Sequence, residues 1–223
     1  MSTVDHLIYV VKNLEFGIQK FTDILGIKPI IGGKHIKWGT HNAIFSLNNN
    51  AYFEIISIDP SNTNISTPIF LCDLNNEGLR SWVSQIPLKY DNIEMYKEYM
   101  LNTTNYDIGN IVNGQRLIDN TDILLEWKLG WPNNKHINDE TNGLIPLMID
   151  WRPTNMNHHP SNTSPKGCEL LSLNGFHNNY TEYNDIISSM EMDKKVSFFP
   201  VSYDNFVGLS CELITPNGLI EIR

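Results

Sequence analysis

The chain has 223 residues, of which 41% are hydrophobic and 18% charged, as is typical of a globular protein long enough to bury a core. Its net charge of −9 argues against nucleic acid or an anionic membrane as a partner, because both bind basic surfaces. No apolar run approaches the ~20 residues that cross a bilayer. The 3 cysteines are widely spaced and form no Cys-x-x-Cys pair, so we expect reduced thiols in a cytoplasmic protein.

The N-terminal quarter of the chain predicts a strand, a helix and three further strands. Residues 4–11 alternate as a strand does, and residues 14–26 have helical spacing with a glycine stop. The stretch GGKHIKWGTHN and residues 43–59 supply the remaining strands, the last two joined by a short asparagine turn.

Two later segments repeat this order of elements. The second has strands at 79–86, 114–118, 123–129 and 144–151, with a helix at 91–101. The third has strands at 168–176, 196–202 and 207–222, with a helix at 180–190, and its last hairpin turns on Pro216-Asn217-Gly218. The closest internal match sets Glu54 against Glu221, both predicted within strands, where a buried carboxylate needs a cation or donors.

The repeated βαβββ order predicts an α+β protein. We expect residues 1–152 to form a paired module, residues 153–166 a linker and residues 167–223 a third, half-module. A lone unit leaves one side of its sheet uncovered. We therefore expect it to pack on the first module or against its copy in a homodimer.

Several stretches of the chain together resemble the glyoxalase-like domain family of the vicinal oxygen chelate superfamily. They are DHLIYVV, GGKHIKWGTHNAIFSL, YFEIISIDP, IPLMIDW and PKGCELLSL, spread over most of the chain. The resemblance implies that paired βαβββ units form a strongly curved, cup-like mixed sheet that holds a small ligand. In members that use a metal, the resemblance further implies a divalent cation held by residues of the first and last strand of each unit.

Carried over position by position, the resemblance makes His6 and Glu54 the metal ligands of the first unit. The second unit offers Asp150 near the expected register, but its opening strand has Ser81 where a histidine is expected. The third unit offers Glu221, again without a matching histidine, so no pair of units supplies all four ligands. A cation held by His6, Glu54, Asp150 and water remains one prediction. Without a metal, we expect Glu54 to act as general base with His6 as its partner or electrophile.

The stretch GGKHIKWGTHN leaves two interpretations open. If His41 points outward, Asn42 points inward, because neighbouring residues of a strand alternate, and its amide would bind a ligand beside His41 and Trp38 at the rim. Otherwise this is a glycine-twisted edge strand with exposed histidines. We favour either one over a metal site made from His35 and His41.

Aromatic residues and linker histidines complete the candidates. Trp127, Trp151 and Trp38 could line the cup, although residues of this kind more often belong to the core. Paired histidines such as His158 and His159 are usually solvated, unless the linker folds over the pocket. No phosphate-binding loop or Rossmann glycine pattern occurs, so we expect no nucleotide cofactor.

Two functions from different classes follow from these predictions. The first is an enzyme with lyase, isomerase or dioxygenase-related chemistry on a small oxygenated metabolite, assisted by a metal where one binds. The second is a non-catalytic protein that binds or sequesters a small molecule, as the drug-resistance members of this superfamily do. Fold resemblance alone does not decide between them.

Overall fold

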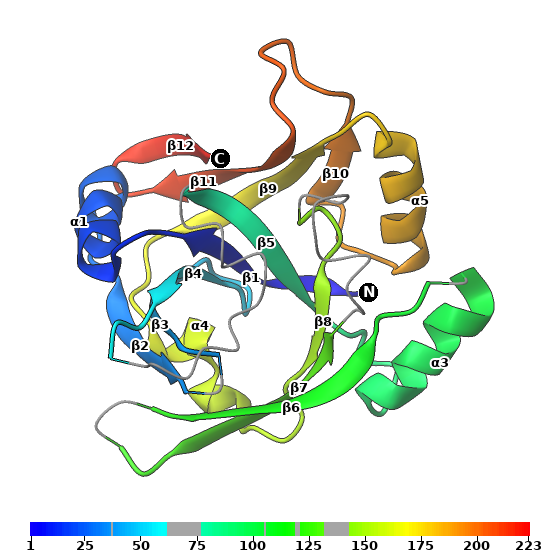
Figure 1. Cartoon of the computed structure of the whole chain (residues 1–223), viewed down its shortest axis with the longest axis horizontal. Helices are drawn as coiled ribbons and strands as arrows, with labels where there is room; N and C mark the ends of the chain where they lie inside the picture. The colour runs from blue at the N-terminus through cyan, green and yellow to red at the C-terminus, as the bar shows by residue number, and fades with distance from the viewer. Residues whose placement is uncertain (37, 62–76, 105, 119–120, 132–142) are drawn as a thin grey trace.

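The computed structural model describes residues 1–36, 38–61, 77–104, 106–118, 121–131 and 143–223. Three groups of elements follow one another along the chain (Figure 1). The first contains β1 (Thr3–Val10), α1 (Leu14–Leu25), β2 (Ile30–His35), β3 (Thr40–Ser46) and β4 (Tyr52–Ile58). The second contains β5 (Gly78–Gln85), α3 (Ile93–Thr104), β6 (Asn110–Leu117), β7 (Leu124–Trp131) and β8 (Leu147–Asp150). After the short helices η1 (Met156–His158) and α4 (Pro160–Thr163) come β9 (Glu169–Phe176), α5 (Tyr180–Ser189), β10 (Val196–Phe199), β11 (Gly208–Thr215) and β12 (Gly218–Ile222).

The first two groups form one eight-stranded sheet in the order β2-β3-β4-β1-β5-β8-β7-β6. β1 pairs with β4 in parallel, β5 pairs with β8 in the same way, and the antiparallel pair β1–β5 joins the two halves. The sheet curls until its outer strands, β2 and β6, come into contact (Figure 1). The Arg116 guanidinium on β6 donates to the Gly32 carbonyl on β2 and so links the two edges. The predicted α+β fold with a curved, cup-like mixed sheet is confirmed.

Helix α1 forms where the sequence supplies both a cap and an apolar stripe. The Asn13 side chain accepts a hydrogen bond from the Phe16 amide at its start, and Gly26 ends it with a φ of 77°. Phe21 is buried against the outer face of the sheet. The turn between β11 and β12 contributes as well, because the Asn217 amide donates to the carbonyls of the last helical turn.

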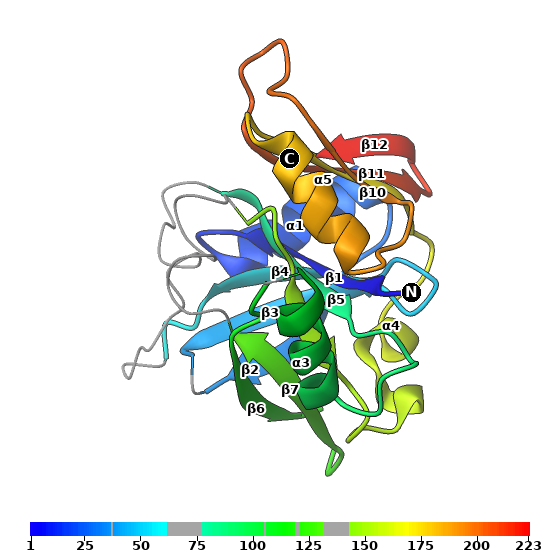
Figure 2. The same ribbon diagram turned by 90° about the vertical axis from the view of Figure 1, so that its right-hand side faces the viewer.

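The third group forms a separate four-stranded sheet, in the order β10-β9-β11-β12, which packs on the outer side of the large sheet (Figure 2). β11 contacts β5, and one continuous apolar core joins the two sheets, as we expected for a unit that cannot cover its own face. The prediction that Glu221 matches Glu54 is wrong. β12 is an edge strand paired only with β11 among the described strands, and Glu221 is exposed beside Arg223.

Among the described residues, no helix is both long enough and apolar enough to serve as a membrane span.

Candidate functional site

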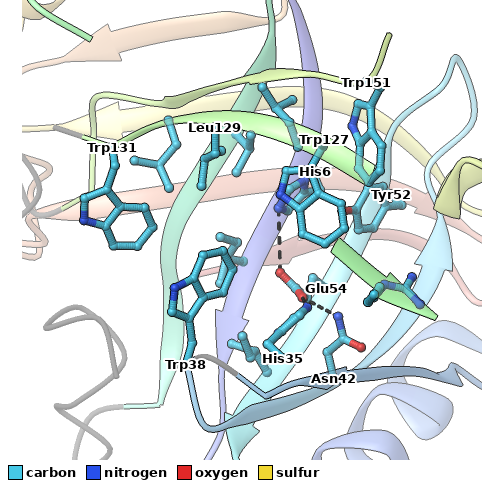
Figure 3. Close-up of a pocket in the computed structure, with 16 residues that line it drawn as sticks. His6, His35, Trp38, Asn42, Tyr52, Glu54, Trp127, Leu129, Trp131 and Trp151 are labelled. Carbon is cyan, nitrogen blue, oxygen red and sulfur yellow. Dashed lines mark hydrogen bonds and ion pairs between the residues drawn. The ribbon is translucent and has the colours of Figure 1, made fainter. Parts of the chain in front are cut away.

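A pocket lies inside the curve of the large sheet, and all eight strands of that sheet contribute residues to it. Its open space, with the mouth and adjoining solvent included, amounts to about 640 Å³. One end carries polar groups, whereas most of the remaining wall is aromatic or aliphatic (Figure 3). The lining residues are His6, Ile8, His35, Trp38, Asn42, Tyr52, Glu54, Ile56, Val83, Arg116, Trp127, Leu129, Trp131, Leu147, Ile149 and Trp151.

Much of the wall around the polar groups is built from tryptophan. Trp38 stacks on Trp131, with ring centroids 5.7 Å apart, and Trp127 packs at 5.1 Å from Trp151. These rings contact one another, yet all of them also face the open space of the pocket (Figure 3). The aromatic residues therefore belong to core and pocket at once, and they present a flat, apolar surface to a ligand.

Glu54 is the centre of the polar end. It lies on β4 with 5% of its surface exposed, and Figure 3 shows it between His6, His35 and Asn42. The Asn42 side-chain amide donates to Glu54 Oε1, while His6 Nε2 lies 3.7 Å from Oε2 and His35 Nε2 lies 3.9 Å from Oε1. Burial lowers the pKa of His35, and the Glu54 charge raises it in part. A fixed, buried carboxylate thus faces two imidazole nitrogens.

Asp5 fixes the orientation of His6. Its carboxylate is fully buried and accepts hydrogen bonds from His6 Nδ1 (2.6 Å), Gln85 Nε2 (2.8 Å) and Trp151 Nε1 (2.9 Å). Burial alone would raise the pKa of Asp5, but hydrogen bonds from His159 and His6 outweigh it and hold the pKa well below its usual range. Since an ionised carboxylate only accepts, His6 Nδ1 carries a proton and Nε2 points at Glu54.

A β-bulge explains how Asp5 and His6 come to share the inner face. The register between β1 and β5 shifts between Val4 and His6. Val4 and Leu7 both belong to the outer core, so the two residues between them face inward together.

His159 is the second histidine on Asp5, and it is completely buried. The Ser161 backbone amide donates to His159 Nδ1, so the other nitrogen, Nε2, donates to Asp5 Oδ2 at 3.2 Å. The His159 ring also packs edge-on against Tyr52 and Trp151. The segment after β8 therefore supports the polar end from behind.

Tyr52 and Arg116 complete the polar end. Tyr52 stacks on His6, with ring centroids 4.5 Å apart, and burial, reinforced by the charges of Asp5 and Glu54, raises the pKa of its hydroxyl. Arg116 is 9% exposed and brings a cation into the pocket. Burial lowers its pKa, although Tyr52 and Glu54 oppose that shift.

The structure brings together His6, Glu54, Asn42, Trp38 and Trp127 at this pocket, and it leaves His41 and Asp150 outside. His41 alternates with the inward-facing Asn42, and burial lowers its pKa. Asp150 points away from the cup. Its carboxylate accepts from the Ile93 amide at the start of α3 and pairs with Arg152 at 2.8 Å, so it is engaged as a helix cap and an ion-pair partner.

The donor set does not fit the four-ligand metal centre that the resemblance implies. Within the part of the chain that the structure describes, no group of three His, Cys, Asp or Glu side chains is placed to hold a metal ion. His6 and Glu54 face the pocket from the first half, but Val83 pairs in register with His6, and Leu147 and Ile149 line the pocket from β8. An ion at His6 and Glu54 would therefore meet hydrocarbon from β5 and β8 in place of the second pair of ligands.

Besides Tyr52, four polar residues that we did not select from the sequence belong to this site. Asp5 precedes His6 in the quoted DHL motif, so a signal existed, but simple alternation turns it to the other face. Arg116 comes from an edge strand that reaches the first half only when the sheet curls closed. His159 comes from the linker. His35 reaches the pocket because β2 and β3 pair as antiparallel strands, in which His35 lies opposite Thr40, on the same face as Asn42.

A glycine on β6 makes room for one wall of the pocket. Gly114 pairs in register with Trp127, and a Cβ at this position would lie 2.3 Å from the indole Nε1. We expect Gly114→Ala to displace the ring and to lower the free energy of unfolding by about 1–3 kcal/mol. Thermal unfolding and near-ultraviolet circular dichroism would show both effects. In the double variant Gly114→Ala/Trp127→Leu the smaller side chain makes room, so a cost equal to the sum of the single variants would contradict this account.

A family model and one solved structure agree with this architecture. The family model described as a glyoxalase-like domain matches residues 4–186. A hypothetical protein from Staphylococcus aureus has a similar structure, with a TM-score of 0.63 and 17% identity over 99% of this chain and 85% of that chain. Methylmalonyl-CoA epimerase from Mycobacterium tuberculosis gives a TM-score of 0.38 and 11% identity over 66% and 84%, respectively. Methylmalonyl-CoA epimerase from Streptomyces coelicolor gives a TM-score of 0.39 and 9% identity, over 66% of this chain and 93% of that chain. No curated protein matches the chain.

Proposed function

Since the chain belongs to the glyoxalase-like domain family, we propose that its pocket binds a small oxygenated molecule and that Glu54 transfers a proton to and from it. The observation that carries this proposal is the arrangement at the polar end. A buried carboxylate, held by Asn42, faces His6 Nε2, and Asp5 holds the other nitrogen of that ring. A base with an oriented partner at one end of an apolar pocket suits proton abstraction beside a carbonyl group.

The proposed chemistry assigns one step to each side chain. Glu54 removes a proton from the carbon next to the ligand carbonyl, and the electron pair of that C–H bond moves toward the carbonyl oxygen. His6, whose ring is oriented by the hydrogen bond from Nδ1 to Asp5, donates a proton from Nε2 to the oxygen that gains charge. Return of a proton from Glu54 to the carbon, with the proton on the oxygen going back to His6 Nε2, restores both the ligand and the protein. The tryptophan wall excludes water and holds the apolar part of the ligand.

A second candidate is binding without chemistry. The observation that favours it is the apolar wall that β5 and β8 contribute to the pocket, where Val83, Leu147 and Ile149 provide no catalytic group. A protein of this kind would sequester its ligand between the tryptophans, with His6, Asn42 and Glu54 serving only for recognition.

Solvent exchange with a simple probe distinguishes the two candidates. We choose 2-hydroxyacetophenone, which carries a hydroxyl beside a carbonyl on an aromatic ring and has exchangeable protons on the intervening carbon. In deuterated water, we expect the protein to bind this probe and to accelerate the loss of its C–H signal in proton nuclear magnetic resonance spectra. Binding without accelerated exchange would support the second candidate. The absence of binding, measured by calorimetry, would contradict both.

A further inference from the structure

Arg116 is the charged group of the pocket that the proposed proton transfer does not use. It lies on β6, nine-tenths buried, and its side chain lines the open space that also contains Glu54. Among the described residues its guanidinium donates one hydrogen bond, to the Gly32 carbonyl. A guanidinium has five N–H donors in a planar fork, so that contact leaves further donors in the pocket.

Within the described ranges of the chain, no acidic side chain forms an ion pair with Arg116. No carboxylate among the described residues lies within 4.0 Å of it, whereas Arg152 and Arg223 have such partners. Glu54 and Tyr52 act on Arg116 only at longer range, and burial lowers its pKa in spite of them. Buried arginines are normally paired, because removing the charge from water is costly. The missing anion therefore points to a ligand.

The surroundings decide which kind of anion fits. Glu54 occupies the same polar end, and its negative charge would repel a doubly charged phosphate more strongly than a singly charged group. A carboxylate carries one charge and matches the guanidinium fork with two parallel hydrogen bonds. The tryptophans that line the pocket suit a planar, apolar body on the same molecule.

We propose that Arg116 forms an anion subsite, and that the ligand of this pocket is a small organic carboxylate whose apolar or aromatic body lies against Trp127 and Trp131. The inference rests on the proposed function, because it names the ligand class of the same pocket. In this arrangement Arg116 binds the carboxylate of the ligand, and Glu54 and His6 act on the oxygenated carbon next to that carboxylate.

A pair of isosteric probes tests the subsite. Phenylglyoxylate carries a carboxylate next to a carbonyl on an aromatic ring, and phenylglyoxylamide replaces that carboxylate by a neutral amide. By titration calorimetry at low salt, we expect the full-length protein to bind the carboxylate at least about tenfold more tightly than the amide. In Arg116→Gln, which keeps a donor for Gly32, this preference disappears. Arg116→Lys keeps the positive charge but lacks the planar guanidinium fork, so we expect it to retain only part of the preference for the carboxylate.

The controls separate the subsite from general effects. Arg223→Gln removes one positive charge from the surface, so it should leave the preference unchanged. Amide binding reports on the shape of the pocket, and in Arg116→Gln it should stay within a factor of about three of the unsubstituted protein. Equal binding of both probes to the unsubstituted protein would overturn the carboxylate subsite and leave the proposed function intact. Failure of both probes to bind would overturn the carboxylate subsite and the proposed function together.

Discussion

Replacing Asp5 by alanine is expected to lower the free energy of unfolding by about 3–5 kcal/mol, because a fully buried acceptor of several hydrogen bonds is lost. The indole N–H of Trp151, the Gln85 amide and His159 Nε2 would each lose the oxygen to which they donate. His6 would also lose the group that fixes its ring. Urea unfolding of the two proteins measures the difference.

The pH dependence of the unfolding free energy tests whether the negative charge of Asp5 is the source of this stabilisation. The folded-state pKa lies below the ordinary value of 3.8, so the stabilisation is complete above that pH and is lost as the pH falls below it. Asp5→Asn keeps the shape of the side chain and removes this dependence. We expect the gap in unfolding free energy between the unsubstituted protein and Asp5→Asn to narrow as the pH falls from about 4 toward 2.

An exposed carboxylate provides the comparison for Asp5. Asp122→Ala removes an exposed acid and should leave the unfolding curve almost unchanged at neutral pH. A gap between the unsubstituted protein and Asp5→Asn that stays constant from pH 7 to 2 would show that shape, rather than charge, accounts for the contribution of Asp5.

Glu54→Gln is expected to slow probe exchange by about 10²- to 10⁴-fold, the usual contribution of a positioned general base. The substitution removes the proton acceptor but keeps an oxygen that can accept from the Asn42 amide, so the pocket should retain its shape. Binding of 2-hydroxyacetophenone should therefore change only a few-fold. Exchange rates and calorimetry on the same preparations separate the two effects.

The matched control for Glu54 is Glu126→Gln. Glu126 is exposed on β7 and does not line the pocket, so its substitution makes the same chemical change outside the site. We expect exchange at the unsubstituted rate in this variant. Exchange that continues at that rate in Glu54→Gln would remove Glu54 from the proposed chemistry, whatever the binding results.

Local pattern was sufficient for most of the fold and for part of the site. Most strands and the three longer helices were predictable from an apolar period, a cap or a turn, such as Asn13 and Gly26 around α1, whereas the short helices η1 and α4 lie in the stretch that we expected to be a linker. His6 and Glu54 came from the resemblance and do face each other. The inward orientation of Asn42 followed from alternation with His41.

The errors arose where position in space departs from local periodicity. Asp150 lies one residue from Ile149, which does face the cup, so a register error of one placed it on the wrong side. The β-bulge at Asp5 breaks the alternation of a regular strand, so Asp5 shares the inner face with His6. Arg116 and His159 reach the polar end only through closure of the sheet and the path of the linker, and neither of these is encoded in a local pattern.

The contact between Asp5 and His159 also bears on the order in which the protein can assemble. The two residues are 154 positions apart, so the first strand emerges during synthesis long before the histidine that completes its environment. Until then, the aspartate lacks one of the groups that keep it ionised in the interior. Contacts of such long sequence separation form slowly. The polar end of the pocket is therefore finished late, after the chain beyond the large sheet has been made.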